Sequence, residues 1–232
     1  SRDGSIGLGL DCRAEFSVPG HDGIISCGVS LDGVFPRGGE NSSVKIGIRD
    51  LTDGEYSLAK QNFLVTYSGG TIRAETVQSV VPLRLRAEYS TSDPELDLSV
   101  RAENISLRSL FESSPRRGLS ARLSGITADL SADARIGLSP FSVSYSSSGN
   151  VRVPRTLVPG GAAVSYSLSG DRAGIDIAEF SVTGDDVDAS LSASCRFADL
   201  NISGSADIRR ILLPNGNPLS AELYFDPMER GF

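Results

Sequence analysis

Apolar and polar residues alternate with a period of two along several parts of this chain. The clearest stretches are 44–48, 81–89, 96–102 and 187–197. Successive side chains of a β-strand point to opposite faces of a sheet, so each stretch predicts a strand with one apolar and one polar face. We therefore predict an all-β fold, built from a long, repeat-like antiparallel sheet.

Clusters of turn-forming residues separate these stretches and suit meandering antiparallel strands. They combine Gly, Pro, Asn, Asp and Ser, which favour the backbone angles of tight turns. The predicted turns include Ser68-Gly69-Gly70, Ser92-Asp93-Pro94, Gly149-Asn150, Asp171–Gly174 and Gly184–Asp186.

A single short helix is predicted near residues 107–114. Leu107, Leu110 and Phe111 recur at helical spacing, and Pro115 with Gly118 ends the run. Because the chain opens at Ser1 without an initiator Met or a leader pattern, we expect residues 1–232 to be a single β-groove segment of a longer protein. The Pro- and Gly-rich stretch 154–161 is the candidate for a longer loop or for a seam within it.

Composition narrows the classes of function. Hydrophobic residues make up 39 % of the chain, but aromatic residues only 6 %, and there is no Trp. The interior is therefore expected to consist of Val, Ile, Leu and Ala. A net charge of −7 argues against a nucleic-acid partner, because phosphate-binding surfaces carry the opposite sign. No apolar run approaches the roughly 20 residues that span a bilayer, so we expect any membrane anchor to lie outside this fragment.

Candidate chemistry is sparse, and we expect neither enzymatic activity nor a cofactor. His21 is the single histidine, and no phosphate-binding loop or nucleophile elbow is present. Asp185, Asp186 and Asp188 offer carboxylates to Ca²⁺, but a solvated hairpin turn is the simpler interpretation, so no metal site is predicted. Three cysteines, an odd number, argue against a disulfide framework.

The apolar strand faces themselves are the candidate site. A closed sandwich would use them as a core, whereas an open curved sheet would use them as a trough for acyl chains. Slim aliphatic side chains without large aromatics favour the trough. The residues expected to line it are Val44, Ile46, Ile48, Val81, Leu83, Leu85, Leu96, Leu98, Val100, Ile175, Ile177, Val187, Leu191 and Ile202.

Three segments resemble the AsmA-like superfamily, with the closest likeness to its TamB members. Residues 63–73 resemble the superfamily's strand–Gly turn–strand unit, and residues 96–111 its strand running into a short Leu-containing helical turn. Residues 174–184, followed by 187–208, are similar to its closing pattern of alternating strands. The resemblance extends over most of residues 44–208 and rests on pattern rather than on invariant residues.

This resemblance implies a β-taco, a long, curved antiparallel sheet that forms an open hydrophobic groove. It also implies a periplasmic protein anchored in the inner membrane that bridges the two membranes of the cell envelope. It further implies that phospholipid acyl chains move along the groove. TamB-like proteins are also associated with outer-membrane protein assembly, alongside an outer-membrane barrel partner of the Omp85 type. Two other interpretations stay open: a structural or adhesive extracellular β-repeat, and a closed β-sandwich that binds another protein.

Overall fold

The predicted all-β architecture is confirmed. The computed structural model describes residues 6–17, 24–36, 41–52, 57–58, 60–77, 81–110, 123–212 and 217–225. These residues form fifteen strands and one four-residue helix, and every strand pairing is antiparallel. The chain divides into two units, Ser1–Ser124 and Gly125–Phe232. Each unit is one open sheet.

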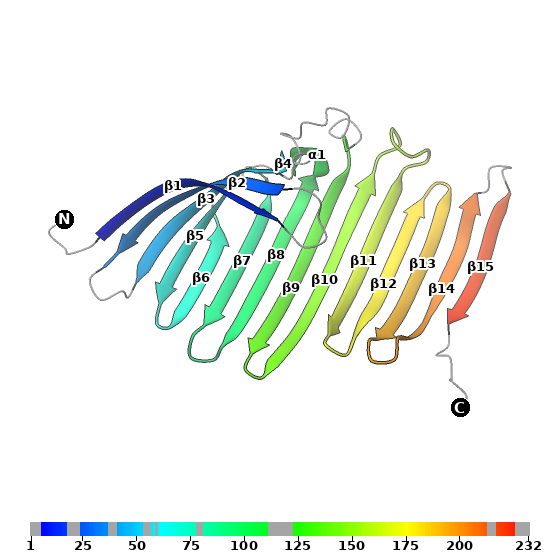
Figure 1. Ribbon diagram of the computed structural model, residues 1–232. Coiled ribbons are helices and arrows are strands. Elements are labelled where there is room, and N and C mark those ends of the chain that lie inside the picture. Colours follow the sequence, from blue (N-terminus) through cyan, green and yellow to red (C-terminus); the bar gives the residue numbers. More distant parts are fainter. Residues whose placement is uncertain are drawn as a thin grey trace. The chain divides into compact units, whose positions relative to one another are not determined.

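Unit 1 is a meander in which sequential strands lie side by side, in the order β1-β2-β3-β5-β6-β7-β8 (Figure 1). Strand β4 pairs with β3 outside this path. In the figure β1 and β2 run at a steep angle to β7 and β8, as expected from the twist that accumulates across a sheet. The strands are β1 (Ile6–Ser17), β2 (Ile24–Phe35), β3 (Ser42–Thr52), β4 (Ser57–Leu58), β5 (Gln61–Ser68), β6 (Thr71–Thr76), β7 (Leu83–Ser90) and β8 (Glu95–Ser106).

Unit 2 is a second meander, of seven strands in sequence order from β9 to β15. Most are 10 to 13 residues long, and β15, at the edge, has eight. The strands are β9 (Thr127–Leu138), β10 (Phe141–Val153), β11 (Ala162–Asp171), β12 (Gly174–Gly184), β13 (Val187–Arg196), β14 (Asn201–Leu212) and β15 (Pro218–Phe225).

Most of the predicted turns lie between strands. Gly69 and Gly70 form the two-residue loop between β5 and β6 with φ angles of 57° and 77°, which glycine adopts without steric cost. The Asp171 carboxylate accepts hydrogen bonds from the backbone N–H groups of Ala173 and Gly174 and so fixes the turn from β11 to β12. The turn predicted at Gly149-Asn150 is wrong. Both residues lie inside β10, where Gly149 makes room for the side chain of Tyr166.

The predicted helix is present as α1 (Leu107–Leu110), and positions 111–114 of that prediction lie outside the described residues. The candidate seam at 154–161 connects β10 to β11. These two strands pair along ten residues, from Ser144–Asp171 to Val153–Ala162, so they form one hairpin. The boundary between the two units lies between Ser124 and Gly125.

Neither sheet has a conventional core. Among the described residues only four hydrophobic side chains are buried, namely Cys27, Val81, Ala102 and Ile105, and all four belong to unit 1. The chain exposes 15272 Å², whereas a folded monomer of this mass ordinarily exposes roughly 10,000 Å². A larger exposed area is expected for single-layer sheets, because a strand in one layer has no second sheet packed against it. Neither unit is a closed sandwich.

In three strands the alternation of apolar and polar residues is interrupted by one extra residue, and a β-bulge accommodates that residue. In β12 the pattern slips at Ala178, and the pairing with β11 and β13 shifts by one residue there. In β14 it slips at Arg209, and the pairing again shifts. In β3 the shift occurs beside Asp50, whose φ of 52° a short polar side chain tolerates. The extra residue is absorbed each time, so the apolar side chains after the bulge return to the same face.

Candidate functional site: an uncovered apolar face on each sheet

The strand pairings of unit 1 place its apolar residues on one face. Val44 is opposite Val65, Val65 opposite Ala74, Ala74 opposite Ala87, and Ala87 opposite Leu98. Residues that are directly opposite share a face of the sheet. The same face continues onto β2 and β1 through the pairs Ile46–Leu31 and Leu31–Leu10.

Unit 2 carries an equivalent face that crosses all seven strands. One unbroken row of paired residues runs from β9 to β15: Ala128, Val151, Val164, Val182, Ala189, Ile208 and Ala221. Parallel rows contain Ile136 opposite Val143, and Leu191 between Phe180 and Ala206. With about 4.8 Å between strands and about 3.3 Å per residue, this face measures roughly 30 Å in each direction.

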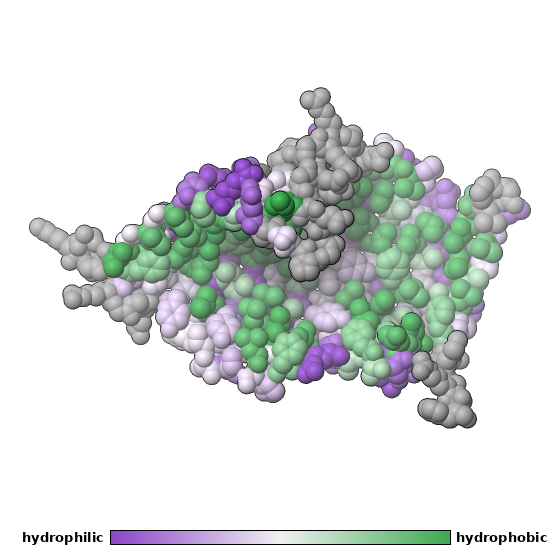
Figure 2. All heavy atoms as spheres, viewed as in Figure 1, coloured by the Kyte–Doolittle hydropathy of each residue, from purple (hydrophilic) through white to green (hydrophobic). Residues whose placement is uncertain are grey.

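Much of this apolar surface is open to solvent. In unit 2, Phe141 is 57 % exposed, Ile202 54 % and Leu223 46 %. Figure 2 shows hydrophobic residues gathered over the strands of unit 2 and over β1 to β3 of unit 1. Monomeric proteins rarely expose contiguous apolar patches of more than a few hundred Å², and larger patches mark sites of interaction. The apolar face of unit 2 exceeds that limit.

The charged residues lie on the opposite face of each sheet. None of the residues paired on the two apolar faces is Asp, Glu, Lys or Arg. In unit 1, Glu88 accepts hydrogen bonds from Arg86 at 2.7 Å and Arg73 at 3.1 Å. These bonds lower the pKa of the Glu88 carboxyl below its ordinary value, because they stabilise the carboxylate.

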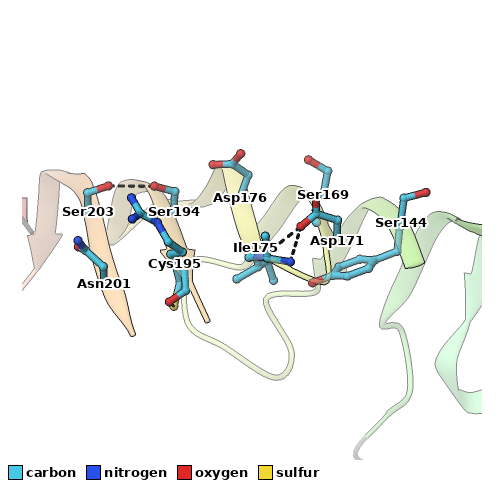
Figure 3. Close-up of a pocket in the computed structure, with 14 residues that line it drawn as sticks. Ser144, Ser169, Asp171, Ile175, Asp176, Ser194, Cys195, Asn201 and Ser203 are labelled. Carbon is cyan, nitrogen blue, oxygen red and sulfur yellow. Dashed lines mark hydrogen bonds between the residues drawn. The ribbon is translucent and has the colours of Figure 1, made fainter. Parts of the chain in front are cut away.

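The polar face of unit 2 is dominated by serine hydroxyls. Figure 3 shows Ser169, Asp176, Ser194 and Ser203, from four neighbouring strands, on one side of the sheet and Cys195 on the other. The hydroxyls of Ser194 and Ser203 are 2.9 Å apart, and a second pair, Ser192 and Ser205, is 3.2 Å apart. Ser194 and Ser203 are among the residues that line a hollow of about 580 Å³. Each sheet thus has one polar face and one apolar face.

The structure brings together most of the residues predicted to line the groove. In unit 1, eight of them lie on the common apolar face, in strands β3, β7 and β8: Val44, Ile46, Ile48, Leu83, Leu85, Leu96, Leu98 and Val100. In unit 2, Ile175, Ile177, Val187, Leu191 and Ile202 share the face of strands β12 to β14. Val81 differs. It precedes β7 and is 1 % exposed, so its side chain is packed away from the open surface.

Several lining residues were missed by the sequence analysis. Leu8, Leu10 and Leu31 belong to the face of unit 1, and the signals for them were the alternation from Ile6 to Ala14 and from Ile25 to Leu31. The aromatic residues of the two faces were also missed, among them Phe63, Tyr145, Tyr166 and Phe180. Their isolated occurrences gave no pattern, because each sits in a separate strand.

The remaining candidate groups are the turn carboxylates, the cysteines and His21. Asp185 forms an ion pair with Arg155 at 2.8 Å, and Asp188 lies 3.6 Å from Arg209, as expected for a solvated turn. The described part of the chain contains no group of three side chains suited to a metal ion. Cys12 and Cys27 lie on neighbouring strands, offset by two residues, and both are free thiols, as is Cys195. His21 lies outside the described residues.

No helix within the described ranges is long and apolar enough to span a membrane. No family model, curated protein or solved structure matches the chain.

Proposed function

We propose that this chain is a lipid-binding segment of a TamB-like or AsmA-like envelope protein, and that acyl chains of phospholipids bind along its apolar faces. In this proposal the parent protein is anchored in the inner membrane. It conducts phospholipid across the periplasm to the outer membrane and supports outer-membrane protein assembly there, with an Omp85-type barrel as a partner. The observation that carries the proposal is the uncharged apolar face, open to solvent, of each single-layer sheet.

Physical chemistry supports an acyl chain as the ligand. Burial of each CH₂ group contributes about 0.8 kcal/mol, without any need for specific hydrogen bonds. The aliphatic rows of Val, Ile, Leu and Ala offer such burial along the whole width of unit 2. A protein partner would normally require a polar rim with hydrogen bonds around an apolar centre. Here the polar groups lie on the reverse face of the same strands.

The test is site-specific photo-crosslinking at two consecutive residues of β13. Their side chains point to opposite faces of the sheet, so one position is the control for the other. A photo-reactive phenylalanine derivative at Leu191 presents its benzophenone group on the apolar face. The same residue at Ser192 presents it on the opposite face, one position along the chain. If the proposal is correct, irradiation in cells links phospholipid to position 191 and not to position 192. Equal labelling of both positions, or of neither, contradicts it.

Native mass spectrometry of the purified chain gives a second readout. The mass spectrum is expected to contain a species of the chain with bound phospholipid, and this species should disappear on delipidation. A chain that never carries lipid, and whose position 191 crosslinks to a protein instead, would favour the structural or adhesive β-repeat.

A further inference from the structure

A pair of hydroxyl groups interrupts the apolar face of unit 2 on the hairpin formed by β10 and β11. The side-chain oxygens of Ser147 and Tyr166 are 3.2 Å apart. Both residues belong to the apolar face, because Ser147 is opposite Leu168, and Tyr166 is opposite Gly149 and Phe180. On the polar face a serine hydroxyl is one among many. Here the two hydroxyls are surrounded by aliphatic and aromatic side chains.

A glycine on the neighbouring strand determines where the Tyr166 hydroxyl lies. Gly149 has no side chain, and the ring of Tyr166 lies across it: a Cβ atom there would be 2.7 Å from Cε1 and 3.0 Å from Cζ. The ring therefore lies along the sheet instead of standing away from it. Its hydroxyl is thereby carried from β11 over β10, where it meets Ser147.

The two hydroxyls together carry one more hydrogen-bond donor than the bond between them uses. Each hydroxyl has one donor, and the bond between the two uses only one of them. The second O–H is free to donate to a further acceptor, which is water when the face is empty. An alkyl chain lying over the pair would remove that water and leave the donor unpaired, which is unfavourable. A ligand with an acceptor at this point avoids the penalty.

We propose that the Ser147–Tyr166 pair recognises the ester carbonyl of an acyl lipid and holds it at the β10–β11 hairpin. The acyl chain then extends over the aliphatic rows on either side, such as those of Val151 and Ile136. A carbonyl is a neutral acceptor, which suits a face without charged side chains. The inference rests on the proposed function, since it names the part of the lipid that is recognised.

The test compares two lipids that differ only at the linkage, diester phosphatidylcholine and the corresponding diether, which lacks both carbonyl groups. Binding is measured by displacement of a fluorescent fatty acid from the delipidated chain. The chain is expected to bind the diester about threefold to tenfold more tightly, the effect of one hydrogen bond to a neutral acceptor. Tyr166→Phe and Ser147→Ala should lower diester affinity to that of the diether and leave diether affinity unchanged.

Ser146→Ala is the matched control. Ser146 precedes Ser147 on the same hairpin and lies opposite Ser169, so its side chain is on the polar face. This variant removes the same kind of hydroxyl from the other side of the sheet and should keep the preference for the diester. Equal binding of the two lipids by the unmodified chain would overturn the inference and leave the proposed function intact. Failure of the folded chain to bind either lipid would contradict the proposed function itself. Loss of the preference in Ser146→Ala alone would also overturn the assignment to Ser147 and Tyr166.

Discussion

The ring of Tyr166 covers Gly149 of the neighbouring strand, so that a Cβ atom added to this glycine would be 2.7 Å from the ring and 2.8 Å from the carbonyl oxygen of Asp129. Real Cβ contacts do not approach so closely, and the second neighbour is backbone, which has little freedom to move. Glycine in the interior of a strand is usually destabilising, because it packs nothing and loses much entropy on folding. At this position, however, the missing side chain is what allows the ring to lie along the sheet.

We therefore expect Gly149→Ala to lower the free energy of unfolding by about 1–3 kcal/mol, the usual effect of overpacking. Chemical denaturation followed by circular dichroism measures the change. Gly9→Ala is the control, because a Cβ at Gly9 meets nothing within 4 Å, and this variant should be neutral or slightly stabilised. An unchanged stability of Gly149→Ala would show that the ring moves aside without cost.

The bulge in β12 predicts an unusual tolerance to deletion. Without Ala178 the sequence reads Ile-Asp-Ile-Glu-Phe-Ser-Val, which alternates without a break and keeps Ile177 and Phe180 on the apolar face. Deletion of Ala178 should therefore change stability by about 1 kcal/mol or less, since it removes only an unpaired residue.

Deletion of Ser192 is the matched comparison. No bulge lies within β13 at that position, so Leu191 and Ala193 would become neighbours and one half of the strand would turn its apolar residues to the polar face. Thermal denaturation of both deletion variants checks the prediction. The deletion of Ser192 should lower the midpoint by many degrees or prevent folding. Equal damage from the two deletions would contradict the role assigned to the bulge.

The sequence predicted some strands well and failed where a strand has the composition of a turn. Strict alternation located β3, β7, β8 and β13 to within a few residues, because a period of two is typical of a β-strand with two unlike faces. It failed for Gly149-Asn150, which has the composition of a turn but lies within a strand. Local composition cannot show that the ring of Tyr166, seventeen residues further on, needs the space.

Whether the apolar face is open or covered was beyond the sequence for a different reason. Leu191 alternates with serine in the same way in a sandwich as in a single sheet, because alternation reports two unlike faces and not what lies against them. The pairings and the exposure of residues such as Ile202 were needed to show single layers. The Ser147–Tyr166 pair could not be foreseen either, since it depends on the register of β10 against β11.

The ion pairs of the polar face predict a small dependence of stability on pH. Hydrogen bonds from Arg86 and Arg73 lower the pKa of Glu88 in the folded state, so the carboxylate stabilises the fold above its unfolded pKa of about 4.5. This stabilisation is lost as the pH falls through the folded value. Because the groups are exposed to solvent, it should amount to a few tenths of a kcal/mol.

Glu88→Gln should therefore be slightly less stable than the unmodified chain at pH 7 and equally stable near pH 3. Denaturation at the two pH values measures the difference, and a carboxyl NMR titration of Glu88 should give a pKa below 4.5. A titration midpoint above 4.5 would show that the arginines do not hold the carboxylate in solution.

The strongest test of the apolar face is a charge placed on it. Leu191 lies between Phe180 and Ala206 on the face of unit 2, and Ser192, its neighbour, points to the opposite side and lies 3.2 Å from the Ser205 hydroxyl. Leu191→Asp places a carboxylate among aliphatic side chains, and Ser192→Asp places the same group among hydroxyls. Neither residue is buried, so both carboxylates keep contact with water, and both variants should fold with a loss of about 1 kcal/mol or less.

The two variants should differ in lipid capture. An acyl chain crossing Leu191→Asp would have to cover an ionised carboxylate, which is strongly unfavourable, so co-purified phospholipid should fall severalfold or more. Ser192→Asp should retain the lipid of the unmodified chain, because its charge lies on the far side of the sheet. Thermal midpoints establish that both variants are folded, and native mass spectrometry measures the bound lipid. Unfolding of Leu191→Asp alone would indicate that the face is a covered core. Normal lipid content in a folded Leu191→Asp would show that acyl chains do not bind along this row.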